Sequence, residues 1–93
     1  MTISTRPSER KKALLNELAS LNHIVCGSFF ERTLNGKPRF ILSRMRQGKQ
    51  RQIYVAQRHA QAVAEGVREY ERALEILGEL GDLNINILKH GDK

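Results

Sequence analysis

The chain has a single cysteine and no tryptophan, and these shortages exclude several classes of protein. With only Cys26 among its 93 residues, neither an intrachain disulfide nor a zinc site built on cysteines can form. No apolar run approaches the ~18 residues that a membrane span needs. The opening residues, MTISTRPSERKK, contain no apolar signal core. We therefore expect a cytoplasmic protein without a membrane partner, in which Cys26 packs as a small buried side chain.

Patterns that carry catalysis or metal binding are also lacking. The three histidines, His23, His59 and His90, are far apart in the sequence and have no ligand-like spacing. The glycines do not form a phosphate-binding loop. Glu31 is the one acid between residues 28 and 58, and we expect it to pair with an arginine rather than to act as a general base. The sequence thus predicts no enzyme, catalytic residue, metal, cofactor or small-molecule substrate.

The stretch from Ser28 to Arg58 predicts an antiparallel meander of three strands. Asn35-Gly36 lies between two apolar runs, and this dipeptide is the strongest short-range hairpin signal because both turn residues must tolerate positive φ. Gln47-Gly48 separates the second run from the third. The expected strands cover residues 24–34, 37–46 and 50–55.

Helical periodicity flanks the predicted sheet on both sides. Leucines recur at helical spacing after Ser8, which is a suitable N-cap, and they predict a helix over residues 8–21. A long helix is expected after Gln57. Gly78 and Gly81 each weaken it by ~1 kcal/mol relative to alanine, so a break near them stays open.

These elements predict an α+β fold: an N-terminal helix, a three-stranded antiparallel β-meander and a long C-terminal helix. Residues 8–89 are expected to form a single domain. A flexible basic arm is expected at residues 1–7 and a disordered tail at residues 90–93.

Alternation along the strands gives the sheet two faces, each partly apolar and partly basic. We expect the buried set to be Phe40, Leu42, Ile53 and Val55. The exposed set would then be Arg39, Ile41, Ser43, Met45, Gln50, Gln52 and Tyr54, with Arg44, Arg46 and Arg51 at the rim. A slip of one residue would invert this assignment.

The positive charge of the chain is concentrated in the predicted sheet. Residues 28–58 hold eight cationic side chains and one acidic one, a net charge of +7, whereas the whole chain carries +6. Arginine predominates, and its guanidinium suits bidentate contacts with phosphate or guanine. We therefore predict a small nucleic-acid-binding protein, with DNA favoured and RNA left open. The predicted contact residues are Arg32, Lys37, Arg39, Arg44, Arg46, Lys49, Gln50, Arg51, Gln52 and Arg58.

A second hypothesis concerns the long C-terminal helix. Two adjacent apolar stripes give its later half a wider apolar face than a small sheet and one short helix can cover. The helix would then form a homodimer or dock onto a partner protein. The predicted interface residues are Leu74, Leu77, Leu80, Leu83 and Ile87. Salt separates the two hypotheses, because phosphate contacts weaken with salt and an apolar interface persists.

The chain resembles a small uncharacterised bacterial domain family that is often found near transposases and other mobile elements. The resemblance covers residues 24–88 and rests on Gly27, Ser28 and Arg32, on the strands PRFILSR and GK…IYV, and on the helix EYERALEILGELGDLNINIL. Many members carry a Cys-rich segment between the first two strands. Here the short turn from Leu34 to Lys37 replaces it, so no metal role carries over. The family has no established activity to carry over, and its setting favours the hypothesis of a regulator or accessory factor of a mobile element.

The order of strands, glycine turns and alanine-rich helix is also similar to the DNA-binding domains at the N-termini of tyrosine-recombinase integrases. In those domains a three-stranded sheet enters the major groove of DNA. This similarity implies a binding module in which Arg39, Arg44, Lys49, Arg51 and Gln52 are the positions to test.

Overall fold

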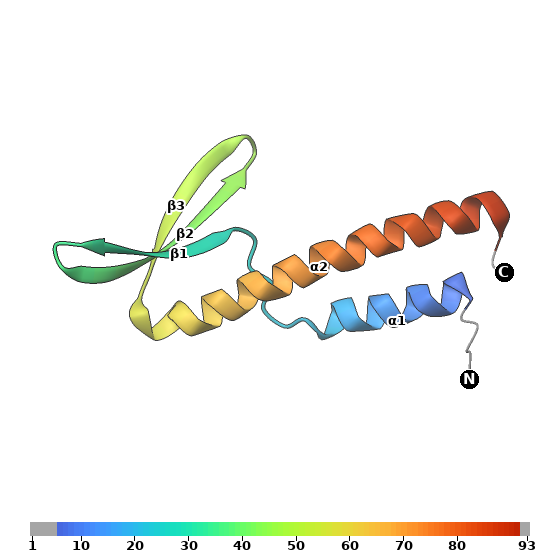
Figure 1. Ribbon diagram of the computed structural model, residues 1–93, viewed down its shortest axis with the longest axis horizontal. Helices are drawn as coiled ribbons and strands as arrows, with labels where there is room; N and C mark the ends of the chain where they lie inside the picture. The colour runs from blue at the N-terminus through green and yellow to red at the C-terminus, as the bar shows by residue number, and fades with distance from the viewer. Residues whose placement is uncertain (1–5, 92–93) are drawn as a thin grey trace. The chain divides into compact units, whose positions relative to one another are not determined.

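The computed structural model of the chain describes residues 6–91 and has the predicted α+β architecture (Figure 1). Its elements, in chain order, are α1 (Pro7–Ser20), β1 (Ser28–Leu34), β2 (Lys37–Arg46), β3 (Lys49–Val55) and α2 (Gln57–His90). They divide into two compact units. One unit is His23–Glu71, which holds the sheet and the first part of α2. The other combines α1 with the part of α2 that begins at Arg72.

The sheet is the predicted antiparallel meander, in the order β1-β2-β3. Leu34 pairs with Lys37 and Arg46 pairs with Lys49, so both turns have two-residue loops. The loop residues all have positive φ: 54° and 75° at Asn35-Gly36, and 52° and 75° at Gln47-Gly48. Positive φ at both positions matches the right-handed twist of the flanking strands, which explains why these dipeptides set the register.

Strand β1 begins at Ser28 rather than at Ile24, because the residues before it pair with α2. The Val25 N–H donates to the Gly66 carbonyl at 3.0 Å, and the His23 N–H donates to Glu69 Oε1 at 2.8 Å. Gly66 is buried at this contact. Residues 23–25 therefore run alongside the first part of α2, and backbone N–H groups in this segment donate to the helix rather than to the sheet.

The two faces of the sheet differ less in burial than predicted. Ile41 is fully buried and Leu42 is 7 % exposed, although consecutive strand residues point to opposite faces. The prediction that Ile41 is exposed is wrong, because both faces are covered at the middle of the central strand. Ile53, predicted to be buried, is 40 % exposed. Phe40 and Val55 are half-buried, and the Phe40 ring stacks on Phe29 with centroids 6.0 Å apart.

Helix α1 begins one residue earlier than predicted. Pro7 occupies the first turn, where its missing N–H costs nothing, and Arg6 is the N-cap without a side-chain hydrogen bond. Ser8 is therefore inside the helix rather than its cap. Of the predicted flexible arm, residues 1–5 lie outside the described part of the chain.

Helix α2 is continuous over 34 residues and passes through Gly78 and Gly81 without a break. The predicted tail begins later than expected, since His90 is helical. Gly91 ends the helix with φ of 78°, and its N–H donates to the Ile87 carbonyl at 2.8 Å. Residues 92–93 lie outside the described part.

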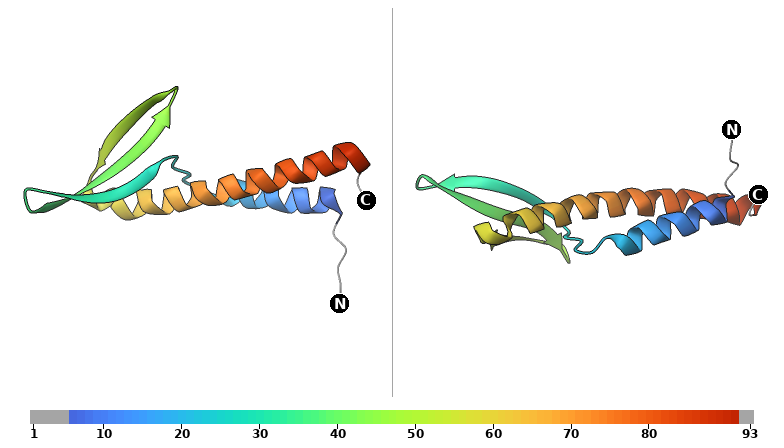
Figure 2. Two further views of the ribbon diagram at one scale, coloured as in Figure 1. Left: turned by 45° about the horizontal axis from the view of Figure 1, so that its top comes forward. Right: turned by 90° about the horizontal axis from the view of Figure 1, so that it is seen from below.

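The α1–α2 unit is an antiparallel helix pair, with α1 alongside the second half of α2 in every view (Figure 2). Leu14 and Ile76 are fully buried and form its core with Leu80, while Leu18, Leu21 and Leu83 pack against them. Burial of this stripe explains the continuous helix, because apolar packing outweighs the ~1 kcal/mol that each glycine costs.

Two bidentate ion pairs connect α1 with α2. Arg10 donates to both oxygens of Glu79 at 2.5 and 3.0 Å, and Arg72 donates to both oxygens of Glu17 at 2.5 and 2.7 Å. The hydrogen bonds from the guanidinium groups lower the pKa of each carboxyl and raise the pKa of each arginine. The Arg10 pair also explains how a cation is tolerated in the first turn of α1, where the helix dipole disfavours positive charge.

Candidate nucleic-acid interface

The hairpin of β2 and β3 carries four cations on one face, near its turn. In the observed register Arg44 lies directly opposite Arg51, and Arg46 lies directly opposite Lys49. Directly opposite residues of an antiparallel pair share a face, with their Cβ atoms ~5 Å apart. These four side chains and Gln47 line a common hollow. We call this set (Arg44, Arg46, Lys49 and Arg51) the cationic face of the hairpin.

Among the described residues, no carboxylate forms an ion pair with the cationic face. The ion pairs found within residues 6–91 are those of Arg10 and Arg72, both in the α1–α2 unit. Like charges placed directly opposite each other destabilise a strand pair. In addition, the Nε of Arg44 is buried without a hydrogen-bond acceptor among the described residues. A site with these properties gains by contact with an anion that has several oxygen acceptors, such as a phosphate group.

The opposite face of the same hairpin is polar but uncharged. Ser43 pairs with Gln52, and Met45 pairs with Gln50. The Gln50 Nε2 donates to Ser43 Oγ at 2.9 Å, which fixes one amide across the strands. We call Ser43, Gln50 and Gln52 the amide face. Side chains of this kind offer both donors and acceptors to the edges of bases.

The remaining predicted contact residues lie elsewhere. Arg32 and Arg39 are directly opposite each other near the other turn of the sheet, and Lys37 follows that turn. The Arg32 guanidinium lies over the Phe30 ring, 5.7 Å from its centroid. Arg58 is exposed in the first turn of α2 and not on a strand. The structure thus brings four of the eight predicted cations together on the cationic face.

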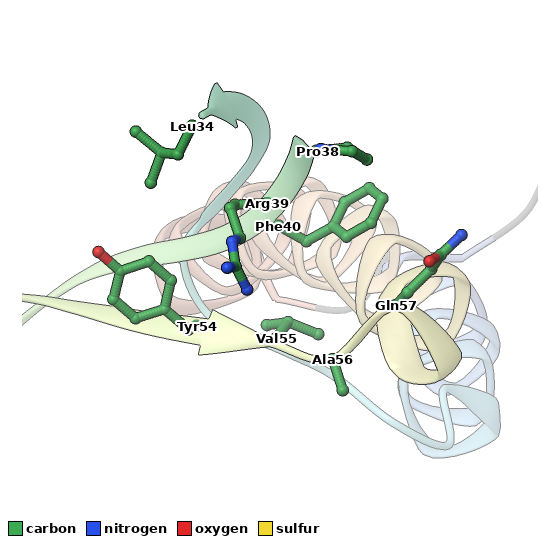
Figure 3. Close-up of a pocket in the computed structure, with 8 residues that line it drawn as sticks. All are labelled: Leu34, Pro38, Arg39, Phe40, Tyr54, Val55, Ala56 and Gln57. Atoms are coloured by element: carbon green, nitrogen blue, oxygen red, sulfur yellow. The ribbon is translucent and has the colours of Figure 1, made fainter. Parts of the chain in front are cut away.

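A groove that the sequence did not reveal lies where β3 ends and turns into α2 (Figure 3). It is an open hollow of about 560 Å³, lined by Leu34, Pro38, Arg39, Phe40, Tyr54, Val55, Ala56 and Gln57. The last pair between β2 and β3 is Phe40 with Val55, whereas the β1–β2 hairpin continues beyond it. The groove arises because the two hairpins are offset along β2: β1 pairs with residues 37–43 and β3 pairs with residues 40–46.

The predicted interface residues of α2 divide into two groups. Leu74 and Leu77 are 50 % and 54 % exposed. Leu80 and Leu83 instead pack against the core shared with α1, and Ile87 is half-buried. Two exposed residues were not included in the predicted set: Ile85 and Leu88, which are 55 % and 85 % exposed.

Other reactive groups are few. Cys26 is exposed, so the expectation that it packs in the core is wrong. It lies beside Tyr70, and this contact raises the pKa of the Tyr70 hydroxyl. Within residues 6–91, no three His, Cys, Asp or Glu side chains gather closely enough to hold a metal ion. None of the helices in this range is long and apolar enough to span a membrane.

Comparison of the chain with protein-family models, with curated proteins and with solved structures found no match.

Proposed function

We propose that the chain binds double-stranded DNA through the β2–β3 hairpin. The observation that carries this proposal is the cationic face: two cross-strand pairs of like charge, none of them neutralised by a carboxylate in the described chain. Release of counterions from phosphates would supply most of the affinity. The repulsion within each pair, which weakens the free hairpin, would be relieved in the complex.

The two faces of the hairpin suggest how it meets the duplex. A two-stranded ribbon fits in the major groove of B-form DNA, where each base pair presents a distinct pattern of donors and acceptors. The amide face would lie toward the base edges, and the longer cationic side chains would reach the phosphates along both sides of the groove. The deep, narrow major groove of A-form RNA does not admit such a ribbon, which favours DNA.

A fluorescence-anisotropy titration against random duplex DNA, repeated over a range of salt concentrations, tests this proposal. The double variant Arg46→Gln/Lys49→Gln removes two cations from the hairpin. It should weaken binding and reduce the slope of log K against log salt by about two, since each phosphate contact contributes about 0.9 on duplex DNA.

The matched control is Lys12→Gln/Lys89→Gln, which removes the same charge from exposed positions on α1 and α2. It should change the slope little. Equal effects of the two double variants would show that net charge, and not the hairpin, causes binding. Circular dichroism of each variant checks that the fold persists.

The resemblance to domains found near transposases suggests a context for this activity. We propose a regulator or accessory factor of a mobile element, acting in the cytoplasm. A selection of preferred sites from random duplexes would test it: enrichment of sequences from the ends of a mobile element in the source genome is expected, and their absence would contradict the proposal.

The second candidate function is self-association through α2. Leu74, Leu77, Ile85 and Leu88 are all at least half exposed on the second half of this helix. At ~100° per residue they fall within about 80° of one side of the helix. The helix pair they belong to is small and has no disulfide, and units of this size commonly need oligomerisation to be stable. We therefore propose a second copy of the chain as the partner, and sedimentation equilibrium tests it.

A further inference from the structure

The groove beside Arg39 is bordered by a segment of β2 that has no partner on one edge. Residues 37–39 pair with β1, but β3 has already ended at Val55. Figure 3 shows the Arg39 guanidinium extending from β2 toward β3, with the Tyr54 ring on one side and the Phe40 ring on the other. The hollow is open to solvent, and the Arg39 guanidinium and the Tyr54 ring both line it.

The lining of this groove combines an apolar floor with two exposed functional groups. Leu34, Phe40 and Val55 supply apolar surface, while the Tyr54 ring is 66 % exposed. Arg39 is exposed and has no carboxylate partner within the described residues, and it faces a second cation, Arg32, across the strands. A ligand that suits this groove has a planar ring and an anionic group.

A peptide strand is a poor occupant of the open edge. In a hairpin with a two-residue loop, the residues next to the loop form a hydrogen-bonded pair, so Arg46 directs its N–H toward β3. The backbone N–H of every second residue before Arg46 in β2 therefore points in the same direction. In the unpaired segment that residue is Pro38, which has no N–H. The edge therefore offers an added strand no backbone donor.

We propose that this groove holds one unpaired nucleotide of a DNA strand, with the base stacked on Tyr54 and the phosphate bound by Arg39. Every base has a flat face, so stacking on tyrosine does not depend on sequence. The guanidinium supplies the donors that a phosphate accepts. This inference rests on the proposed function and adds a preference for duplexes that end in, or are interrupted by, single-stranded nucleotides.

The test compares a blunt duplex with the same duplex carrying a short single-stranded extension of deoxyadenosines. The extended duplex should bind about ten-fold tighter, which is the range that stacking of one base supplies. Substitution of Tyr54→Thr should remove this advantage and leave blunt-duplex binding unchanged, because threonine keeps strand propensity but has no ring. Tyr54→Phe should retain the advantage.

The control for Tyr54→Thr is Met45→Thr, which removes another large exposed side chain from the same sheet face. It should leave the preference for the extended duplex intact. Arg39→Gln should reduce that preference without unfolding the chain, since Arg39 is exposed and makes no ion pair with any described residue.

Tyrosine fluorescence gives a second readout that reports on the ring itself. The chain has two tyrosines and no tryptophan. In a Tyr70→Phe background, Tyr54 is therefore the sole fluorophore, and stacking of a base should quench its emission when the extended duplex is added.

Two results would overturn this inference, and only the second of them would also overturn the proposed function. Equal binding of the two duplexes with unchanged Tyr54 emission would remove the nucleotide site and leave the cationic face in place. Failure of both duplexes to bind at low salt would overturn the proposed function as well.

Discussion

Glycines in α2 have opposite roles at two positions of the same helix. At Gly66 an added Cβ would lie 2.5 Å from Val25 Cγ2 and would overlap the His23 carbonyl oxygen. At Gly81 an added Cβ would meet nothing within 4 Å. The first glycine lets residues 23–25 approach the helix closely, whereas the second lowers helix propensity and makes no contact that compensates.

Alanine substitutions at these two glycines should therefore change stability in opposite directions. Gly81→Ala should raise the free energy of unfolding by ~1 kcal/mol through helix propensity. Gly66→Ala gains the same propensity but must displace Val25 and a backbone carbonyl, so a net loss of about 1–3 kcal/mol is expected. Urea unfolding followed by circular dichroism, at low protein concentration, measures both. A stabilised Gly66→Ala would mean that residues 23–25 do not pack on α2.

The turns are the residues at which the sequence alone was most informative. Asn35-Gly36 and Gln47-Gly48 need positive φ at both positions, and this local requirement fixed the hairpins and their register. The burial of Ile41 could not be predicted in the same way. Its burial depends on which segments cover the middle of β2, and alternation along a strand carries no information about that.

At the scale of elements, the ion pairs show how tertiary structure replaces local pairing. Glu69 and Arg72 lie three residues apart in α2, a spacing at which opposite charges commonly pair on a helix surface. In the structure Arg72 instead makes two hydrogen bonds to Glu17 of α1, and Glu69 accepts the His23 N–H. A bidentate contact outcompetes a single neighbour on the helix surface, and the sequence does not show which distant carboxylate will supply it.

These ion pairs predict a pH dependence of stability. The pKa values of Glu17 and Glu79 are lowered in the folded chain by hydrogen bonds from Arg72 and Arg10. Because the carboxyl pKa values are lower in the folded chain, the unfolded chain binds more protons than the folded chain does at acidic pH. The stabilisation is therefore complete above the ordinary carboxyl pKa of 4.5 and is lost as the pH falls below that value.

The variant Arg72→Gln tests this dependence. At neutral pH it should melt a few degrees below the parent chain, and the difference should close as the pH falls below 4.5 and Glu17 becomes protonated. Arg68→Gln, one helical turn earlier and exposed, is the control and should leave the melting curve nearly unchanged. A difference for Arg72→Gln that persists unaltered to low pH would show that its ion pair with Glu17 is not the cause.

The groove shows what element-level prediction omits. The three strands and both helices follow from turns, alternation and helical periodicity, but their relative lengths decide where β2 extends past β3. The strand ends that border the groove, Lys37 and Val55, match the predicted ones. The directions in which the Arg39 and Tyr54 side chains extend do not follow from the sequence, so this candidate site required the structure.

At the scale of the whole molecule, the two units differ in charge, whereas exposed apolar side chains occur in both. The sheet unit holds all eight cations of residues 28–58, while the α1–α2 unit pairs Arg10 and Arg72 with acids. Ten large apolar side chains are exposed within the described residues, whereas seven apolar residues are buried, one of them the small Ala73. A monomer with so thin a core is expected to bury more surface by association.

Self-association is expected to depend on the exposed apolar side of α2. The double variant Leu77→Gln/Ile85→Gln removes the centre of the exposed apolar side of α2, and it should convert a dimer into a monomer in sedimentation equilibrium. Its control, Leu15→Gln/Met45→Gln, also removes two large exposed side chains but lies outside α2, and it should stay dimeric. High salt should preserve the dimer while it weakens DNA binding, because apolar contacts are not screened. A parent chain that is monomeric at every accessible concentration would contradict self-association and leave the cationic face as the remaining candidate interface.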